Sequence, residues 1–116
     1  TMLTALGSLA TQQANLTTTT LSKVKQFLDY AATHPDAIVT YQASNMVLAA
    51  HSDASYLSES NARSRAGGHF FLTDDEDNPR NNGAILTIAT IIKAVMSSAA
   101  EAELGALFST QKRQFI

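Results

Sequence analysis

Apolar residues in the first third of the chain recur at helical spacing. In "MLTALGSLA" leucines stand at every third position, which predicts a short helix over residues 2–13. In "TTTTLSKVKQFLDYAATHP" a threonine run offers hydroxyl groups for an N-cap, a wider apolar stripe follows, and His34-Pro35 ends the segment. This pattern predicts a second helix over about residues 19–33.

From Met46 onward the pattern alternates with a period of two, which is typical of a strand. One face of the predicted strand is formed by Val47, Ala49, His51, Asp53 and Ser55. The other face is formed by Met46, Leu48, Ala50, Ala54 and Tyr56. The second face is apolar, so the strand is expected to carry a carboxylate, Asp53, on its more polar side.

Two more strands and a third helix follow. We interpret "NARSRAGG" as a basic turn, "GHFFL" as the second strand and "AILTIATII" as the third. The polar stretch "TDDEDNPRNNG" lies between these strands, which predicts a β-hairpin over residues 66–92 with a long tip. "SSAAEAELGALF" begins with serines suited to capping and continues at helical spacing. The order is helix, helix, strand, hairpin, helix, and the predicted fold class is α/β.

Composition limits the kinds of protein that this chain can form. With 116 residues, 45% of them hydrophobic, it is long enough for one compact domain. The net charge of −2 gives no global positive field, so any nucleic-acid binding must be local. The absence of cysteine fits a reducing compartment, and no apolar run is long enough to cross a bilayer. We therefore expect an intracellular protein, cytoplasmic or nuclear, with no membrane partner.

Two carboxylates are candidates for metal chemistry. Asp53 is on the first predicted strand, and Glu101 is in the first turn of the last predicted helix. If the helix packs on the sheet, a carboxylate from a central strand can face one from that helix. Paired carboxylates suit Mg²⁺, and two such ions about 3.5–4 Å apart can hydrolyse a phosphodiester. Glu103 lies about 200° further around the helix and is expected to be solvated or to form a salt bridge.

A family resemblance adds to this interpretation. "HSDASYLSESNARSRAGGHFFL", followed by "NGAIL" and "SSAAEAELGALF", resembles the ribonuclease H region at the C-terminal end of copia-type retrotransposon polyproteins. That region has an aspartate-alanine strand, a basic turn, a glycine-aromatic strand, a further strand, and a helix that begins with a Glu-Ala-Glu motif. Upstream, "TLSKVKQFLDYAATHPDAIVTY" resembles the connector between the reverse-transcriptase thumb and the ribonuclease H. The resemblance covers nearly the whole chain.

The resemblance implies roles for four residues. Asp53 and Glu101 match the first metal-binding aspartate and the helix glutamate, so both would be catalytic ligands of Mg²⁺. Arg63 and Arg65 fall in the basic turn and would contact the phosphates of an RNA–DNA hybrid; the alternative is two solvated arginines. The implied activity is Mg²⁺-dependent hydrolysis of the RNA strand of such a hybrid.

The resemblance also implies a division of the chain. Residues 1–42 would be a helical connector similar to the end of a reverse transcriptase. Residues 43–116 would be the first half of a ribonuclease H-like fold, with three antiparallel strands and one helix. The family supplies further metal-binding aspartates after this helix, whereas the sequence ends at Ile116. We therefore expect a polyprotein fragment that is inactive or very weak on its own.

Two alternatives remain. Half a sheet exposes an edge and apolar surface, so the chain could be a non-catalytic module that forms a homo-oligomer or binds the remainder of the polyprotein. Separately, His51, Asp53 and His69 could hold a transition metal, although a hydrogen-bonded structural role is the alternative for such histidines. The "DDEDN" stretch lacks the spacing of a calcium loop and is predicted to be a solvated hairpin tip.

Overall fold

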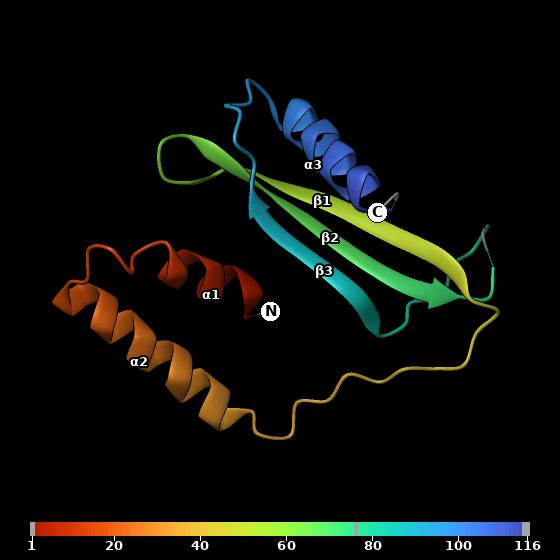
Figure 1. Ribbon diagram of the computed structural model, residues 1–116, viewed down its shortest axis with the longest axis horizontal. Coiled ribbons are helices and arrows are strands. Elements are labelled where there is room, and N and C mark those ends of the chain that lie inside the picture. Colours follow the sequence, from red (N-terminus) through yellow and green to blue (C-terminus); the bar gives the residue numbers. More distant parts are fainter. Residues whose placement is uncertain (1, 76, 115–116) are drawn as a thin grey trace. The chain divides into compact units, whose positions relative to one another are not determined.

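The computed structural model of the protein describes residues 2–75 and 77–114 (Figure 1). Its elements are α1 (Leu3–Ala10), α2 (Thr18–Thr33), β1 (Val47–Glu59), β2 (Arg63–Thr73), β3 (Ala84–Ile91) and α3 (Ala99–Gln114). Within these residues the fold is mixed α/β, with three helices and one three-stranded antiparallel sheet, which confirms the predicted class and order. The chain forms two compact units, Thr1–Ile38 and Val39–Ile116, called here the helical unit and the strand unit.

The helical unit is organised by the threonine run. Thr17 is the N-cap of α2, and its hydroxyl accepts a hydrogen bond from the Thr20 amide at 3.2 Å. The Thr20 hydroxyl in turn donates to the Gln12 side chain at 3.0 Å, and Thr20 is buried. Most buried polar side chains in proteins are hydrogen-bonded, and Thr20 follows this rule. The cap predicted from the sequence is therefore confirmed, and it also links α2 to the segment that follows α1.

The strand unit is built around β2, which pairs with β1 on one side and with β3 on the other. β2 begins at Arg63, so the prediction that the whole of "NARSRAGG" is a turn was wrong. The turn is confined to Ser60–Ala62, where Asn61 and Ala62 have positive φ angles of 60° and 53°. Both glycines of the stretch lie inside the strand, and the contacts of Gly68 indicate that this residue serves packing.

Small residues allow α3 to approach the sheet closely. A Cβ added at Gly68 would lie 3.3 Å from both the Ile88 Cβ and the Thr110 hydroxyl. Ala102 and Ala106 are buried on the same helix, and Ala66 and Phe70 are buried on β2. Figure 1 shows α3 lying along one face of the sheet, where it packs on β1 and β2. The core of the strand unit is this alanine-lined contact.

Residues 39–46 form no strand, but they are attached to the strand unit. The Tyr41 hydroxyl donates to the Ala84 carbonyl at 2.9 Å. The Gln42 amide donates to Asn82 Oδ1 at 2.8 Å, and Asn82 Nδ2 donates back to the Gln42 carbonyl at 3.0 Å. The structural boundary thus falls after Ile38. The division at residue 42 rests on the family resemblance and stays a prediction.

The predicted hairpin tip is exposed at Asp74, Asp75 and Asp77, and Glu76 lies outside the described residues. Asp74 accepts a hydrogen bond from the Asn45 amide at 2.9 Å and pairs with Arg80 at 3.3 Å. The acidic stretch is therefore partly used to hold the start of β1.

Candidate functional site

Asp53 lies on β1, and its side chain is exposed. Among the residues that the structure describes, β1 has a partner on one side only, so Asp53 is on an edge strand and not on a central strand as expected. The reason is that β2 pairs with both β1 and β3 and therefore takes the central position in the three-stranded sheet. The carboxylate is consequently open to whatever approaches this edge.

The strand register determines to which face of the sheet the Asp53 side chain belongs. Ser52 is paired with Gly68, which faces α3, whereas Asp53 is paired with Gly67. Because side chains alternate along a strand, Asp53 belongs to the face opposite α3, together with His51. At an edge strand, residues of both faces can border the same hollow.

Such a hollow, of about 470 Å³, lies between the edge of β1 and α3. It is lined by Ser52, Asp53, Ala100, Glu103, Leu104 and Leu107. The carboxylate that shares this hollow with Asp53 is therefore Glu103. Glu103 is exposed, as Asp53 is, so both side chains are open to water.

Glu101 lies elsewhere, because it caps α3. Its carboxylate accepts hydrogen bonds from the Ser97 hydroxyl at 2.6 Å and from the Ser97 amide at 2.7 Å. These two hydrogen bonds, the one from the hydroxyl first, lower the pKa of Glu101 below its ordinary value. Glu101 lines a separate hollow of about 460 Å³ with Met96, Leu104, Gly105, Phe108 and Gln111. The structure does not bring Asp53 and Glu101 into one hollow.

The phase of α3 explains the difference between the two glutamates. Ala102 and Ala106 are buried, so they mark the face that packs on the sheet. At about 100° per residue, Glu101 and Glu103 diverge to opposite sides of Ala102. Glu103 turns toward the side of the helix that holds Ala100 and Leu107, which borders β1. The pair of alanines four residues apart was the signal in the sequence that could have identified Glu103.

Arg65 serves the sheet. It is only 6% exposed, its Nε donates to Glu59 at 2.6 Å, and its Nη1 donates to the Ala89 carbonyl at 3.0 Å. A phosphate contact by Arg65 would require this ion pair to open. Arg63 lies at the start of β2 opposite Glu59 and is partly exposed. Of the two arginines predicted to bind nucleic acid, Arg63 is the more accessible.

The donor set of the Asp53–Glu103 hollow fits Mg²⁺ in type. This ion is commonly held by one or two carboxylates, with water and substrate phosphates as its other ligands. In the part of the chain that the structure describes, no three side chains of His, Cys, Asp or Glu are grouped closely enough to hold a metal by themselves. A cation at Asp53 and Glu103 would therefore need water or other ligands to complete its coordination.

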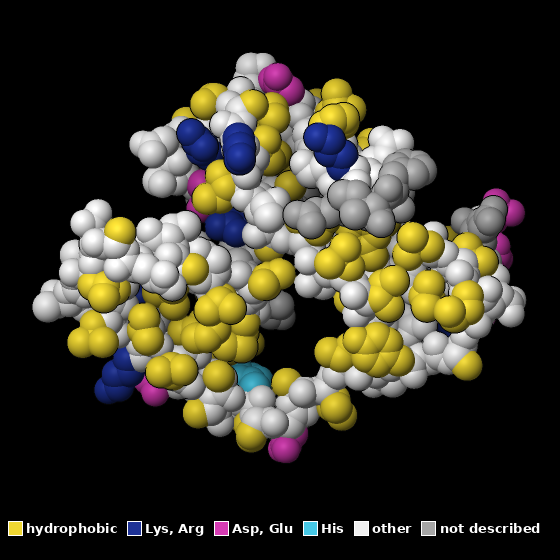
Figure 2. Space-filling model, viewed as in Figure 1, with side chains coloured by type: hydrophobic (Ala, Val, Ile, Leu, Met, Phe, Trp, Pro, Cys, Tyr) yellow, Lys and Arg dark blue, Asp and Glu magenta, His cyan; other side chains and the backbone are white. Residues whose placement is uncertain are grey.

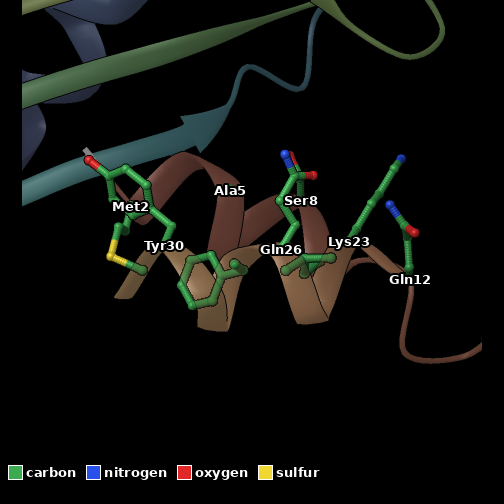
Figure 3. A pocket seen from close by; sticks show the side chains of 9 residues that line it. Met2, Ala5, Ser8, Gln12, Lys23, Gln26 and Tyr30 are labelled. Carbon is green, nitrogen blue, oxygen red and sulfur yellow. The ribbon is translucent and has the colours of Figure 1, made fainter. Parts of the chain in front are cut away.

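The helical unit has a hollow of its own, of about 560 Å³, between α1 and α2 (Figure 3). It is lined by Met2, Ala5, Ser8, Leu9, Gln12, Lys23, Gln26, Phe27 and Tyr30. Figure 3 shows side chains from both helices, with Met2 and Gln12 on either side of α1. Among the described residues of this lining, Lys23 is the one charged side chain, and none carries a carboxylate or an imidazole for acid–base work.

Comparisons with known proteins found no match to a family model, to a curated protein or to a solved structure. None of the helices in the described ranges has the length and apolar character needed to cross a membrane.

Proposed function

We propose that the strand unit belongs to a ribonuclease H-type nuclease of a retroelement, which hydrolyses the RNA strand of an RNA–DNA hybrid with Mg²⁺. The observation that carries the proposal is the hollow at the edge of β1, which Asp53 and Glu103 border together. The order of three antiparallel strands followed by a helix, and the motifs around Asp53 and in "EAEL", also support it.

Each residue of the site would have a distinct role. Asp53 and Glu103 would hold the cation from two elements, the strand edge and the helix. Bound Mg²⁺ would supply an activated water and would stabilise the leaving oxygen. Arg63 would contact a backbone phosphate and so position the hybrid. Glu101 would hold the start of α3 in place, because its carboxylate is already bound to Ser97.

A Mg²⁺ titration monitored by NMR of the side-chain carboxyl carbons tests the site. We expect the Asp53 and Glu103 signals to shift, and we expect Asp53→Asn and Glu103→Gln each to abolish the shift of the partner. Glu101→Gln is the matched control on the same helix and should leave binding intact. If Glu101→Gln abolished binding and Glu103→Gln did not, Glu101 would be the helix ligand after all.

Cleavage is tested with a labelled RNA–DNA hybrid and Mg²⁺. Two carboxylates are few for a two-ion site, so the 116-residue chain should cut slowly or not at all. Robust cleavage that Asp53→Asn removes would contradict this expectation of low activity while supporting the site. Failure of both Mg²⁺ binding and hybrid binding would overturn the proposed function.

The second candidate is an interaction module that pairs with another copy of the chain through the edge of β1. The observation that favours it is that this strand of 13 residues has one unpaired edge within the described residues. Leu48 on β1 is 45% exposed. Figure 2 shows hydrophobic side chains interspersed with polar ones on the visible face of the molecule. Light scattering after size-exclusion chromatography would detect a dimer, and Leu48→Lys should return it to a monomer. A monomer at all concentrations would exclude this candidate.

A further inference from the structure

Two histidines lie side by side on the sheet face opposite α3. His51 on β1 is directly paired with His69 on β2, and their ring centres are 6.4 Å apart. Both rings also contact Phe71, with ring centres 4.9 Å and 5.1 Å from it, and Phe71 is fully buried. The phenyl ring of Phe71 thus lies against both imidazoles.

The hydrogen bonds of His69 assign its ring nitrogens. His69 Nε2 lies 3.3 Å from the Asn82 carbonyl oxygen and 3.2 Å from Asn81 Oδ1. A backbone carbonyl can only accept, so in this contact Nε2 carries the proton. In the neutral ring the lone pair is then on Nδ1, which is the nitrogen that can bind a metal. Histidine ligands in proteins typically donate their other N–H to a carbonyl in this way.

We propose that His51 and His69 bind a divalent transition-metal ion of the Zn²⁺, Ni²⁺ or Cu²⁺ class, at a site separate from the carboxylate hollow. Neutral imidazole is a preferred ligand of these ions, whereas Mg²⁺ prefers oxygen. With metal–nitrogen distances of about 2.0–2.1 Å, two imidazoles on one ion have ring centres roughly 5–6 Å apart. The observed 6.4 Å needs only a small rotation of the exposed His51 side chain to reach that range.

Water would complete the coordination. Within the described residues no third His, Cys, Asp or Glu is placed to join the two histidines. Asp53 is on the same face two residues from His51, where its charge would attract the cation without binding it directly. The site would therefore be open to solvent and to ligands that can replace water.

The test uses the full chain and two probes. Calorimetric titration with Ni²⁺ gives the affinity, and electron paramagnetic resonance with Cu²⁺ reports how many imidazole nitrogens bind. We expect two nitrogens for the unsubstituted chain and one for His51→Ala, with Ni²⁺ binding weakened about tenfold or more. His34→Ala, which removes the histidine at the end of α2, is the matched control and should change neither reading.

The variants separate this site from the proposed Mg²⁺ site. Asp53→Asn should abolish Mg²⁺ binding and retain the two-nitrogen Cu²⁺ signal. Both His51 and His69 contact Phe71, so circular dichroism must accompany each alanine variant to show that the fold is kept. Undiminished Ni²⁺ binding and an unchanged Cu²⁺ spectrum in His51→Ala would overturn the proposal.

Discussion

Arg65 and Glu59 form an ion pair across the first turn of the sheet, with Arg65 Nε 2.6 Å from Glu59 Oε1. The two side chains are only 7% and 16% exposed. The same guanidinium donates to the Ala89 carbonyl on β3, so this one side chain of β2 links all three strands. A charge that is shielded from water needs such partners.

Removing the carboxylate should therefore destabilise the strand unit. We expect Glu59→Ala to lower the free energy of unfolding by about 2–3 kcal/mol, because the pair is slightly more exposed than fully buried pairs, which cost about 3–5 kcal/mol to break. Urea denaturation monitored by circular dichroism measures the change. The exposed Arg80–Asp74 pair offers the control: Arg80→Ala should cost less than about 1 kcal/mol. Equal losses for the two variants would contradict a structural role for the Arg65–Glu59 pair.

The two adjacent glycines of β2 should respond in opposite directions to alanine. At Gly68 the added Cβ would meet Ile88 and Thr110 at 3.3 Å, so Gly68→Ala should cost about 1 kcal/mol or more. At Gly67 the nearest atom would be the Asp53 carbonyl oxygen at 3.6 Å, an ordinary contact. Gly67→Ala should then stabilise by about 0.4–1 kcal/mol, since it restricts the unfolded chain. Thermal melts of the two variants and of the unsubstituted chain show whether each substitution raises or lowers the melting temperature.

Ala62 is strained by its left-handed backbone. Its φ of 53° costs a residue with a Cβ about 1–2 kcal/mol, whereas glycine adopts it without strain. After allowing for the greater freedom of glycine in the unfolded chain, Ala62→Gly should stabilise by about 0.5–1 kcal/mol. Asn61→Gly in the same turn should gain less, because asparagine tolerates this conformation. The stability measurement is urea denaturation, and a loss of stability in Ala62→Gly would disprove the strain.

The cap formed by Glu101 should make part of the stability depend on pH. The pKa of Glu101 in the folded chain is below its ordinary value of 4.5. The ionised form is therefore favoured by folding, and its contribution is present above pH 4.5 and is lost as the pH falls through the lowered pKa. Glu101→Gln should lower the melting temperature at pH 7, and this difference should shrink in acid. Glu103→Gln changes the same charge without the contacts to Ser97, and a difference as large in that variant would argue against the cap.

Periodicity was enough to predict the regular elements. The stripe of α2, its threonine cap and the alternation of β1 are local patterns. The structure has α2 within one residue of its predicted bounds, and β1 begins one residue after its predicted start. The predicted start of β2 was wrong because a short stretch with two arginines and two glycines is typical of a surface turn. The role of Gly68 in the strand depends on its contact with α3, which lies more than 30 residues later. This contact cannot be seen in the local sequence.

The candidate site was predicted less completely. The position of Asp53 on a polar strand face follows from alternation, but its place at an edge depends on how the strands pair. The choice between Glu101 and Glu103 depends on which side of α3 is buried, and small residues such as Ala102 give a weak signal for burial. Arg65 looked like a surface residue because the sequence does not show that Glu59 and Ala89 enclose it.

The hydrogen bonds of Asn82 limit how far the chain can be truncated from its N-terminal side. Its side chain donates to the carbonyls of Gln42 and Leu72, and it accepts from the amides of Gln42 and Gly83, so its four hydrogen-bonding positions are filled. A truncated version that begins after Gln42 would leave two of these positions without their partners at the base of the β2–β3 loop. The segment from residue 39 thus holds the β2–β3 hairpin through these hydrogen bonds. A shortened chain that is meant to contain only the strand unit has to include this segment.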